Sequence, residues 1–333
     1  MVKIAKYLVS VLPLILLILA LARPAWSSDL TLDVTPTQQV YNAGGTVQLD
    51  GTLTNDGVPV SDAFVLLQIN QPKGSPWVIR TLTTGQTPPG PFPVEVLNVT
   101  STDSNGQPKS LFNRGQDAGF KVAIRNNAGS SYSTIVMVNL YYSNGVPFKL
   151  FKIFEGTVDA GNTMILGTYP VPIPADAIAG QATAYASVFN DYPNRTGFAY
   201  GPEGNGTFNI VTGGGTSPPP QSPLGTFNLS IPLKSIPIWL GNYSVYARTQ
   251  YGFLVASSYS AFQVVLAGDM DYNGKIDMRD IAAVAKAFST RPGDPWWNPA
   301  ADITGPEPLV PDGRVDMRDI AIVAKAFGII VIP

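Results

Sequence analysis

The sequence predicts a mainly β protein that ends in a small α-helical module. Gly (32) and Pro (30) are abundant among the 333 residues and only 13% are charged, which is typical of short strands joined by many turns. Apolar and polar residues alternate in short runs from about residue 29 to residue 267, and this period of two indicates β-strands. The remaining residues contain a repeated segment whose apolar residues have helical spacing. We therefore expect β-sandwich domains followed by a helical module.

The first 27 residues have the features of a signal peptide. Lys3 and Lys6 give a positively charged start, residues 8–22 are largely apolar, and Ala25-Trp26-Ser27 places small residues where a cleavage site requires them. The alternative is an uncleaved membrane anchor, although such a span requires about 20 apolar residues. We expect cleavage, and a secreted, extracellular protein associated with the cell surface.

The composition argues against several classes of function. Without Lys3, Lys6 and Arg23, 18 basic residues remain against 23 acidic ones, and this balance argues against nucleic acid and lipid membranes as partners. Cysteine is absent, so no disulfide stabilises the chain. Histidine, the commonest general base and the usual ligand of transition metals, is absent too. We therefore expect any bound metal to be one that prefers oxygen ligands.

The strands predicted before residue 87 are too few for a closed sandwich. Residues 28–87 accommodate roughly four strands, whereas an Ig-like sandwich has about seven. Further alternating segments occur in residues 222–267. Residues 80–84, if joined directly to residues 225–229, have the sequence pattern of one uninterrupted hairpin. We therefore predict one discontinuous Ig-like β-sandwich, formed by residues 28–87 and 222–267.

A second β-sandwich is predicted between these two halves. Residues 92–212 contain their own alternating segments, and Pro/Gly-rich connectors flank them at residues 87–91 and 213–220. Insertion of a domain is tolerated at an exposed loop tip whose ends lie close together. The alternative is three consecutive β units, of which the last is incomplete.

The two halves of the split domain resemble the bacterial Ig-like and macroglobulin-type sandwiches of surface proteins. The resemblance rests on the pattern Tyr-x-x-Gly-x-x-Val from Tyr41 to Val47 and on Gly-x-Tyr-x-Val from Gly241 to Val245. It implies a sandwich fold for the split domain.

Sequons for N-glycosylation occur at five places in the β region. Their asparagines are Asn98, Asn194, Asn205, Asn228 and Asn242. In an exported chain they are candidates for glycosylation, and the alternative is that Asn and Thr are simply common here. Asn228 and Asn242 fall within predicted strands, where they must face the solvent.

A repeat near the C-terminus carries the clearest chemical signal. Residues 277–288 recur 39 positions later as residues 316–327, with 11 of 12 residues identical. The first copy overlaps a twelve-residue loop, residues 269–280, that has oxygen-bearing side chains at positions 1, 3, 5, 9 and 12 and Gly274 at position 6, as in an EF-hand. Calcium requires about six to eight oxygen ligands, which a tight loop of this spacing supplies. The predicted ligands are Asp269, Asp271, Asn273, the carbonyl of Lys275, Asp277 and Asp280.

Two structural expectations accompany this loop. Ile276 at position 8 should pair with its counterpart Val315 in a short two-strand bridge between the loops. The helix that begins near Asp280 should bury one apolar stripe. Its predicted members are Ile281, Val284, Ala285 and Phe288.

The second copy departs from the calcium pattern. Counting back from Asp319 places Val310 and Pro308 at positions 3 and 1, and neither offers a side-chain oxygen. Asp302 and Thr304 instead supply a displaced start, with a six-residue insertion after them. The predicted ligands of a second, weaker calcium site are Asp302, Thr304, Asp312, the carbonyl of Arg314, Asp316 and Asp319.

Two loops, each followed but not preceded by a helix, resemble the type I dockerin. The resemblance covers residues 268–328 of a module that we expect to span residues 268–333. It implies a calcium-folded module that binds a cohesin domain on a scaffold or surface protein, with contacts from loop positions 10 and 11 and from the middle of each helix. On this chain these residues are Met278, Arg279, Ala285 and Lys286, and Met317, Arg318, Ala324 and Lys325. Familiar dockerins often have hydroxyl residues at positions 10 and 11, so Met-Arg implies a different partner surface. The near identity of the copies implies a dual binding mode.

These observations predict a non-catalytic protein whose dockerin attaches Ig-like domains to a cohesin-like partner or a surface layer. The alternatives are a polysaccharide-degrading enzyme and a carbohydrate-binding module within an extracellular complex. Against the enzyme, the β region has only three glutamates, Glu95, Glu155 and Glu203, and no His or Cys. It also lacks an Asp/Glu pair in the aromatic-rich setting that glycoside hydrolysis requires. For sugar binding, Tyr141, Tyr142, Tyr185 and Tyr200 offer an aromatic platform or, more simply, core packing. Trp296 and Trp297 offer a sugar-stacking platform or an anchor for a partner, but we expect at least one of them to pack over the helices.

Overall fold

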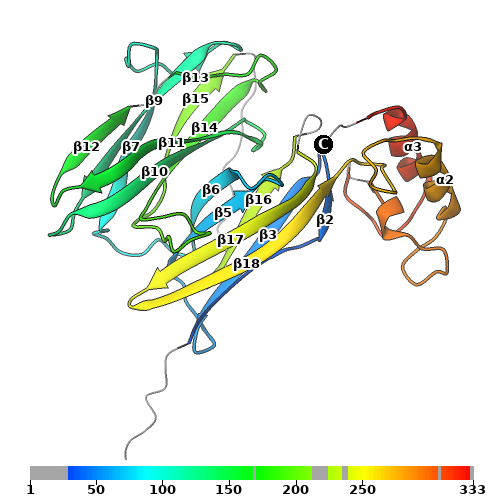
Figure 1. Cartoon of the computed structure of the whole chain (residues 1–333), viewed down its shortest axis with the longest axis horizontal. Coiled ribbons are helices and arrows are strands. Elements are labelled where there is room, and N and C mark those ends of the chain that lie inside the picture. Colours follow the sequence, from blue (N-terminus) through cyan, green and yellow to red (C-terminus); the bar gives the residue numbers. More distant parts are fainter. Residues whose placement is uncertain (1–28, 168–169, 212–223, 235–238, 307–308, 331–333) are drawn as a thin grey trace, which may run out of the picture.

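The computed structural model describes residues 29–167, 170–211, 224–234, 239–306 and 309–330 (Figure 1). The predicted signal peptide lies outside the described residues. Within them the chain is mainly β, as the sequence predicts, with two α-helices near the C-terminus. None of the helices in this part of the chain is both long and apolar enough to cross a membrane.

The strands fall into an early, a middle and a late group along the chain. The early strands are β1 (Leu30–Pro36), β2 (Val40–Asn42), β3 (Thr46–Asn55), β4 (Val58–Pro59), β5 (Phe64–Asn70) and β6 (Pro76–Thr83). The middle strands are β7 (Val94–Thr102), β8 (Leu111–Phe112), β9 (Asp117–Asn126), β10 (Tyr132–Tyr141), β11 (Pro147–Val158), β12 (Thr163–Gly167), β13 (Val171–Pro172), β14 (Gly180–Phe189) and β15 (Gly204–Ile210). The late strands are β16 (Thr226–Pro232), β17 (Gly241–Tyr251) and β18 (Leu254–Val265).

The early and late strands share one hydrophobic core. One sheet has the order β1-β3-β16, with β4 paired to β3, and the other has the order β2-β18-β17-β5-β6. β16 pairs with β3 through Leu229 and Leu49, and β17 pairs with β5 through Ala247 and Leu67, all four of which are buried between the sheets. Figure 1 shows the late strands, in yellow, lying beside the early ones, in blue. We call this set, β1–β6 with β16–β18, the split β-unit.

The hairpin expected between residues 80–84 and 225–229 does not form. β6 is an edge strand of the five-stranded sheet, whereas β16 is an edge strand of the other sheet. Between the two segments, the Gly225 N–H donates to the Thr84 carbonyl at 3.3 Å, but no strand pairing forms. The prediction was wrong because the same alternating pattern fits a strand in either sheet, and β16 pairs with β3 instead.

The middle strands enclose a second core. One sheet has the order β11-β10-β14-β15-β8, and the other has the order β12-β9-β13, with β7 paired to β9. Phe112, Phe120 and Phe208 are fully buried between them and make edge-to-face contacts. We call β7–β15 the central β-unit.

A third apolar cluster lies where the two β-units meet. In β5, Val65, Leu67 and Ile69 face the core of the split β-unit, and Leu66 on the opposite face packs among residues of both units. The other members of this cluster are Ile79, Ile135, Met137 and Phe189. β5 and β10 are therefore buried on both faces, which explains their nearly continuous apolar sequences.

The C-terminal unit, residues 266–330, has its own small core. It contains α2 (Met278–Lys286), the 3-10 helix η1 (Pro299–Ala301) and α3 (Met317–Ala326). Both α-helices begin with a capping box, in which an aspartate at the N-cap and another three residues later each accept a backbone N–H. The core includes Ile276, Val284, Val315 and Val323, so the equivalent positions of the two repeats are buried together.

The bridge expected between Ile276 and Val315 is replaced by two other pairings. Ile276 exchanges backbone hydrogen bonds with residues 328 and 329, after α3, and Val315 exchanges them with residues 289 and 290, after α2. Each loop is therefore tied to the segment that follows the helix of the other repeat. The repeat places both residues at position 8 of their loops, but the local sequence carries no information on their partners.

The apolar stripe of α2 is also shifted from its expected position. Val284 and Ala287 are buried, whereas Ala285 is exposed and Phe288 is 44% exposed. Phe288 lies beyond the end of the helix, where Ser289 adopts a positive φ of 68°. The chain therefore turns before the helical spacing can bring Phe288 to the core.

Candidate metal centre

The first loop brings three carboxylates together. Asp269, Asp271 and Asp280 each present an oxygen atom, and these atoms lie within 4.8 Å of one another. Asp269 and Asp280 are 4% and 1% exposed, while Asp271 lies at the surface. Such a cluster of hard oxygen ligands can hold a metal ion. It is the one group of three or more acidic side chains with this geometry in the described part of the chain.

The backbone of the loop orients the two buried carboxylates. The Asp269 oxygens accept the N–H groups of Asn273 at 3.1 Å and Gly274 at 2.8 Å. The Asp280 oxygens accept the N–H groups of Met270 at 2.7 Å and Asp277 at 2.8 Å. Asp280 therefore joins the start of the loop to the start of α2, which fixes the ends of the loop against each other.

A glycine permits the sharp turn in the middle of the loop. Gly274 has a φ of +79°, and Gly313 at the equivalent place in the second loop has +78°. This left-handed conformation is disfavoured for residues with a Cβ atom. Position 6 of both loops therefore requires glycine for a backbone reason, as the calcium pattern implies.

Burial disfavours the ionised form of the Asp269 carboxyl in the first loop. Desolvation raises the pKa of the Asp269 carboxyl, and hydrogen bonds from Gly274 and Asn273 oppose this effect. The negative charge of Asp280 raises the pKa of Asp269 further. A cation at the loop would stabilise both ionised carboxylates, because it supplies the opposite charge that the buried pair lacks.

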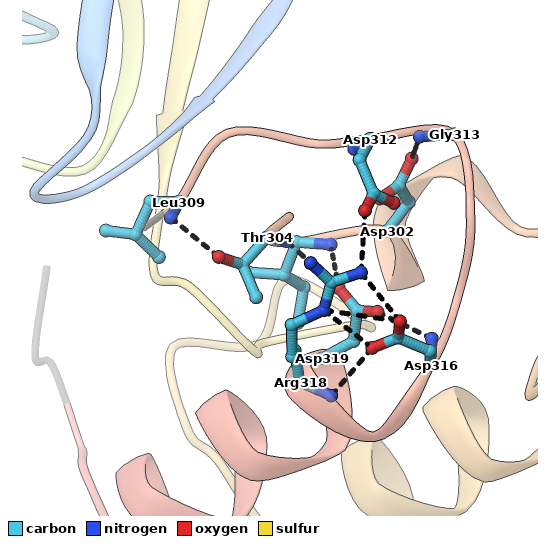
Figure 2. Close-up of polar contacts among 9 residues, drawn as sticks. Asp302, Thr304, Leu309, Asp312, Gly313, Asp316, Arg318 and Asp319 are labelled. Atoms are coloured by element: carbon cyan, nitrogen blue, oxygen red, sulfur yellow. Dashed lines mark hydrogen bonds and ion pairs between the residues drawn. The ribbon is translucent and has the colours of Figure 1, made fainter. Parts of the chain in front are cut away.

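The second loop reproduces the same hydrogen bonds from a displaced start. The Asp302 oxygens accept the N–H groups of Asp312 at 3.2 Å and Gly313 at 2.8 Å, so Asp302 occupies the place of Asp269. One Asp319 oxygen accepts from Ile303 at 2.7 Å and from Thr304 at 2.9 Å (Figure 2). The other Asp319 oxygen accepts the Asp316 N–H at 2.7 Å, as Asp280 does from Asp277.

Thr304 and Asp312, on either side of the inserted residues, keep their places in these hydrogen bonds. Leu309, within the insertion, donates its N–H to the Thr304 hydroxyl at 2.9 Å. Desolvation also raises the pKa of Asp302, as it does for Asp269. The two loops thus share the burial and backbone contacts of their first carboxylates.

An arginine distinguishes the second loop from the first. One Arg318 nitrogen lies 2.7 Å from both an Asp312 oxygen and an Asp316 oxygen (Figure 2). Hydrogen bonds from Arg318 lower the pKa of Asp316 to about 2. In the first loop the place of Asp312 is taken by the neutral Asn273, and within the described residues Arg279 forms no ion pair. The sequence shows that Arg318 follows Asp312 by six residues, but it did not predict that their side chains pair.

The residues proposed to bind a partner lie on the surface. Met278 and Met317 are 65% and 64% exposed. The remaining six, Arg279, Ala285, Lys286, Arg318, Ala324 and Lys325, are also exposed. Trp296 is 61% exposed, with the Lys286 ammonium 4.6 Å from its ring centre, whereas Trp297 packs against the small core. The expectation that at least one tryptophan packs there is therefore confirmed.

The other predicted sites are distributed over the β-units. The asparagines of all five sequons are exposed, including Asn228 and Asn242 within strands. Glu203 pairs with Arg80 and Glu155 pairs with Lys152. Tyr142 stacks on Phe148, and Tyr200 is buried with its hydroxyl donating to the Ser133 carbonyl. Tyr142 and Tyr200 therefore make packing contacts, whereas Tyr141 and Tyr185 contact each other edge-to-face beside Arg80.

Comparisons with known proteins do not place the chain in a family. No protein-family model and no curated protein matches it. Among solved structures, it is similar to the Pseudomonas fluorescens alkylpurine DNA glycosylase AlkC, at 15% identity and a TM-score of 0.28 over 36% of this chain and 31% of that one. It is also similar to the C-terminal domain of Wzt (9% identity, TM-score 0.30, covering 37% and 77%). A third match is the CARDB domain of a Pyrococcus furiosus protein (15%, 0.24, covering 36% and 90%). The chain spans about a third of the glycosylase, and similarity this weak carries no functional argument.

Proposed function

We propose that the C-terminal unit is a calcium-dependent dockerin-like module that attaches two non-catalytic β-sandwiches to a cohesin-like partner or a surface layer. In this proposal the split β-unit corresponds to an Ig-like domain of residues 28–87 and 222–267. The central β-unit, residues 92–212, is a second Ig-like sandwich inserted in it. The chain is secreted after loss of residues 1–27.

The matching hydrogen bonds of the two loops carry this proposal. In each loop a buried first aspartate accepts two N–H groups from the central turn, and a buried last aspartate connects the loop to the helix. Two copies of one anion-rich loop, each with a left-handed glycine at its centre, fit a hard divalent cation. Calcium would supply the charge that the buried carboxylates require and would thereby stabilise the fold of the module.

Exposed residues on both repeats support a docking surface. Met278 and Met317 offer apolar contacts at equivalent positions, and arginines follow both. Arg318 is engaged by Asp312 and Asp316, whereas Arg279 forms no ion pair within the described residues. The two faces therefore have similar shapes but different available charge, and we infer that an acidic partner prefers the face of the first repeat.

Calcium titration of the full secreted chain tests the metal part of this proposal. After removal of calcium by a chelator, calorimetry should detect two sites, and calcium at about 100 times its Kd should stabilise the module by about 2.7 kcal/mol per site. Asp269→Asn should remove the first site and Asp302→Asn the second. Asp33→Asn, an exposed aspartate of β1, is the matched control and should leave both sites intact. The absence of calcium binding would refute the proposal.

Docking is tested by measuring binding to purified cohesin domains with calcium and with chelator. Binding should require calcium and should weaken in a Met278→Ala/Arg279→Ala variant. Binding that persists without calcium, or an affinity that the double substitution leaves unchanged, would exclude the dockerin mechanism.

A further inference from the structure

A large cleft lies between the split and central β-units. It has a volume of about 1240 Å³ and is lined by residues of β6, β10, β14 and β16 and of the segments that follow β6 and β10 or precede β15 and β16. Single small-molecule sites are usually about 300–1,000 Å³, so this cleft has room for a chain of several units. It lies on the β-units, apart from the calcium loops.

The lining of the cleft is polar but carries no net charge. Among the described lining residues, only Arg80 and Glu203 are charged, and they form an ion pair with each other. Hydroxyl and amide side chains, with tyrosine and leucine, make up most of the remaining wall. Examples are Thr83, Gln86, Asn144, Gln181, Thr183 and Ser230. A ligand of net charge would find no counter-charge here, whereas a neutral molecule rich in hydroxyl groups would find donors and acceptors.

Strand alternation presents the β14 side chains to this cleft. Ala182 and Ala184 are buried in the core of the central β-unit. Gln181, Thr183 and Tyr185 alternate with these alanines along β14, lie on the opposite face of the sheet and line the cleft. The positions of these polar groups are therefore fixed by a rigid sheet rather than by a loop.

A buried hydroxyl in the cleft wall has no partner. Thr81 is 3% exposed and lines the cleft, and its Oγ1 atom forms no hydrogen bond. Buried hydroxyl groups are nearly always hydrogen-bonded, so an unpaired one requires an explanation. A ligand hydroxyl that reaches this atom would satisfy it.

The edge of β6 beside the cleft is closed to strand addition. The Ile79 N–H donates to the Asn139 side chain at 3.2 Å, and the Thr81 N–H donates to Glu203 at 3.1 Å. Both acceptors belong to the central β-unit. An extended peptide therefore cannot pair with β6 at these residues, which disfavours recognition of a peptide by strand addition there.

We propose that the cleft between the two β-units binds a neutral oligosaccharide. Hydroxyl groups of the sugar chain exchange hydrogen bonds with the amide and hydroxyl side chains of β6 and β14, including the Thr81 hydroxyl. The Arg80–Glu203 pair holds the two walls at a fixed separation and leaves no free charge.

Binding measurements on the full secreted chain in constant calcium test this proposal. The probes are hexasaccharides of β-1,4-glucose, β-1,4-xylose, β-1,4-mannose and β-1,3-glucose, with hexagalacturonic acid as the anionic comparison and an alternating Val/Thr decapeptide as the peptide comparison. At least one neutral hexasaccharide should bind. Binding of none of them, or binding of only the anionic sugar or the peptide, overturns the proposal.

Three variants locate the binding. Thr183→Arg should abolish it, because the substitution places bulk and an unpaired charge in the cleft. Thr163→Arg, the same change at an exposed position of β12, is the matched control and should have no effect. Thr81→Val removes the unpaired hydroxyl while keeping the shape, so it should leave the stability of the free protein unchanged or higher and weaken binding roughly fivefold to tenfold. Affinity that is unchanged by Thr183→Arg and Thr81→Val overturns the assignment of the cleft.

Discussion

Loss of the carboxylate of Glu203 should destabilise the contact between the two β-units. Arg80 Nε lies 3.1 and 2.9 Å from the two Glu203 oxygens, and Nη2 lies 2.5 Å from one of them. The two side chains are only 13% and 14% exposed. The Arg80 guanidinium also lies 3.7 Å from the ring centre of Tyr185. Burial lowers the pKa of Arg80, but Glu203 together with Tyr141 and Tyr185 outweighs this effect and holds that pKa above its ordinary value.

The size of the effect follows from this geometry. Two unit charges about 4 Å apart at an effective dielectric constant of about 20 attract by about 4 kcal/mol. Glu203→Gln keeps an acceptor but removes the charge, which leaves the guanidinium buried without compensation. We expect a loss of about 3–5 kcal/mol in the free energy of unfolding. Arg80→Met/Glu203→Gln should recover part of it, because the uncompensated charge is then absent.

Urea unfolding at neutral pH in constant calcium measures the loss. Tryptophan fluorescence reports on the split β-unit through Trp77, which packs against its core. The control is Glu155→Gln, which breaks the solvent-exposed pair with Lys152 and should change stability by about 0–1 kcal/mol. If Glu203→Gln is no more destabilising than Glu155→Gln, the pair is not desolvated and the reasoning fails.

Two further predictions concern the candidate metal loops. Arg318→Gln should raise calcium affinity at the second loop several-fold, because the guanidinium then no longer competes for Asp312 and Asp316. Calorimetry measures this affinity, and the control, Arg279→Gln, should have a smaller effect. Equal effects of the two substitutions would refute the competition. Calcium binding to the first loop should weaken on acidification at a pH above the ordinary range of an aspartate, because the pKa of Asp269 is raised and calcium requires its ionised form. Without calcium, the pH dependence of stability has the opposite sign. The native state binds the proton of the Asp269 carboxyl more tightly than the unfolded chain does, because the pKa of this group is raised. The contribution of Asp269 to the free energy of unfolding therefore falls as pH rises through its raised pKa. Melting temperatures with calcium and with chelator across acidic pH test both signs, and a calcium effect that does not change with pH would contradict them.

The candidate metal loops were open to prediction because their geometry is local. In the first loop the cluster of Asp269, Asp271 and Asp280 forms within twelve consecutive residues, so spacing alone identified it. The displaced start of the second loop could be proposed because Asp302 and Thr304 repeat the spacing of Asp269 and Asp271. The ion pairs of Arg318 were missed because they depend on the direction in which a long side chain turns.

Strands whose side chains alternate in polarity were predicted more readily than strands without this alternation. β1 and β3 alternate between buried and exposed residues and were recognised from this period. β11 is an edge strand in which few residues are fully buried, and its sequence carries no such alternation. The proposed sugar cleft was not predicted, because its walls come from β6 and β14, about a hundred residues apart.

The sequence by itself determined the mainly β character, the repeated loops and the positions that must be glycine. Each of these depends on the conformation of a few consecutive residues, which the backbone and its nearest side chains control. Only the tertiary structure decided that Ile276 and Val315 pair with the segments after the opposite helices, and that β16 joins β3 rather than β6. Many partners satisfy the same alternating pattern, and the choice among them depends on which arrangement buries all the apolar faces at once. The Arg80–Glu203 pair and the cleft beside it exist only because that choice brings two β-units together.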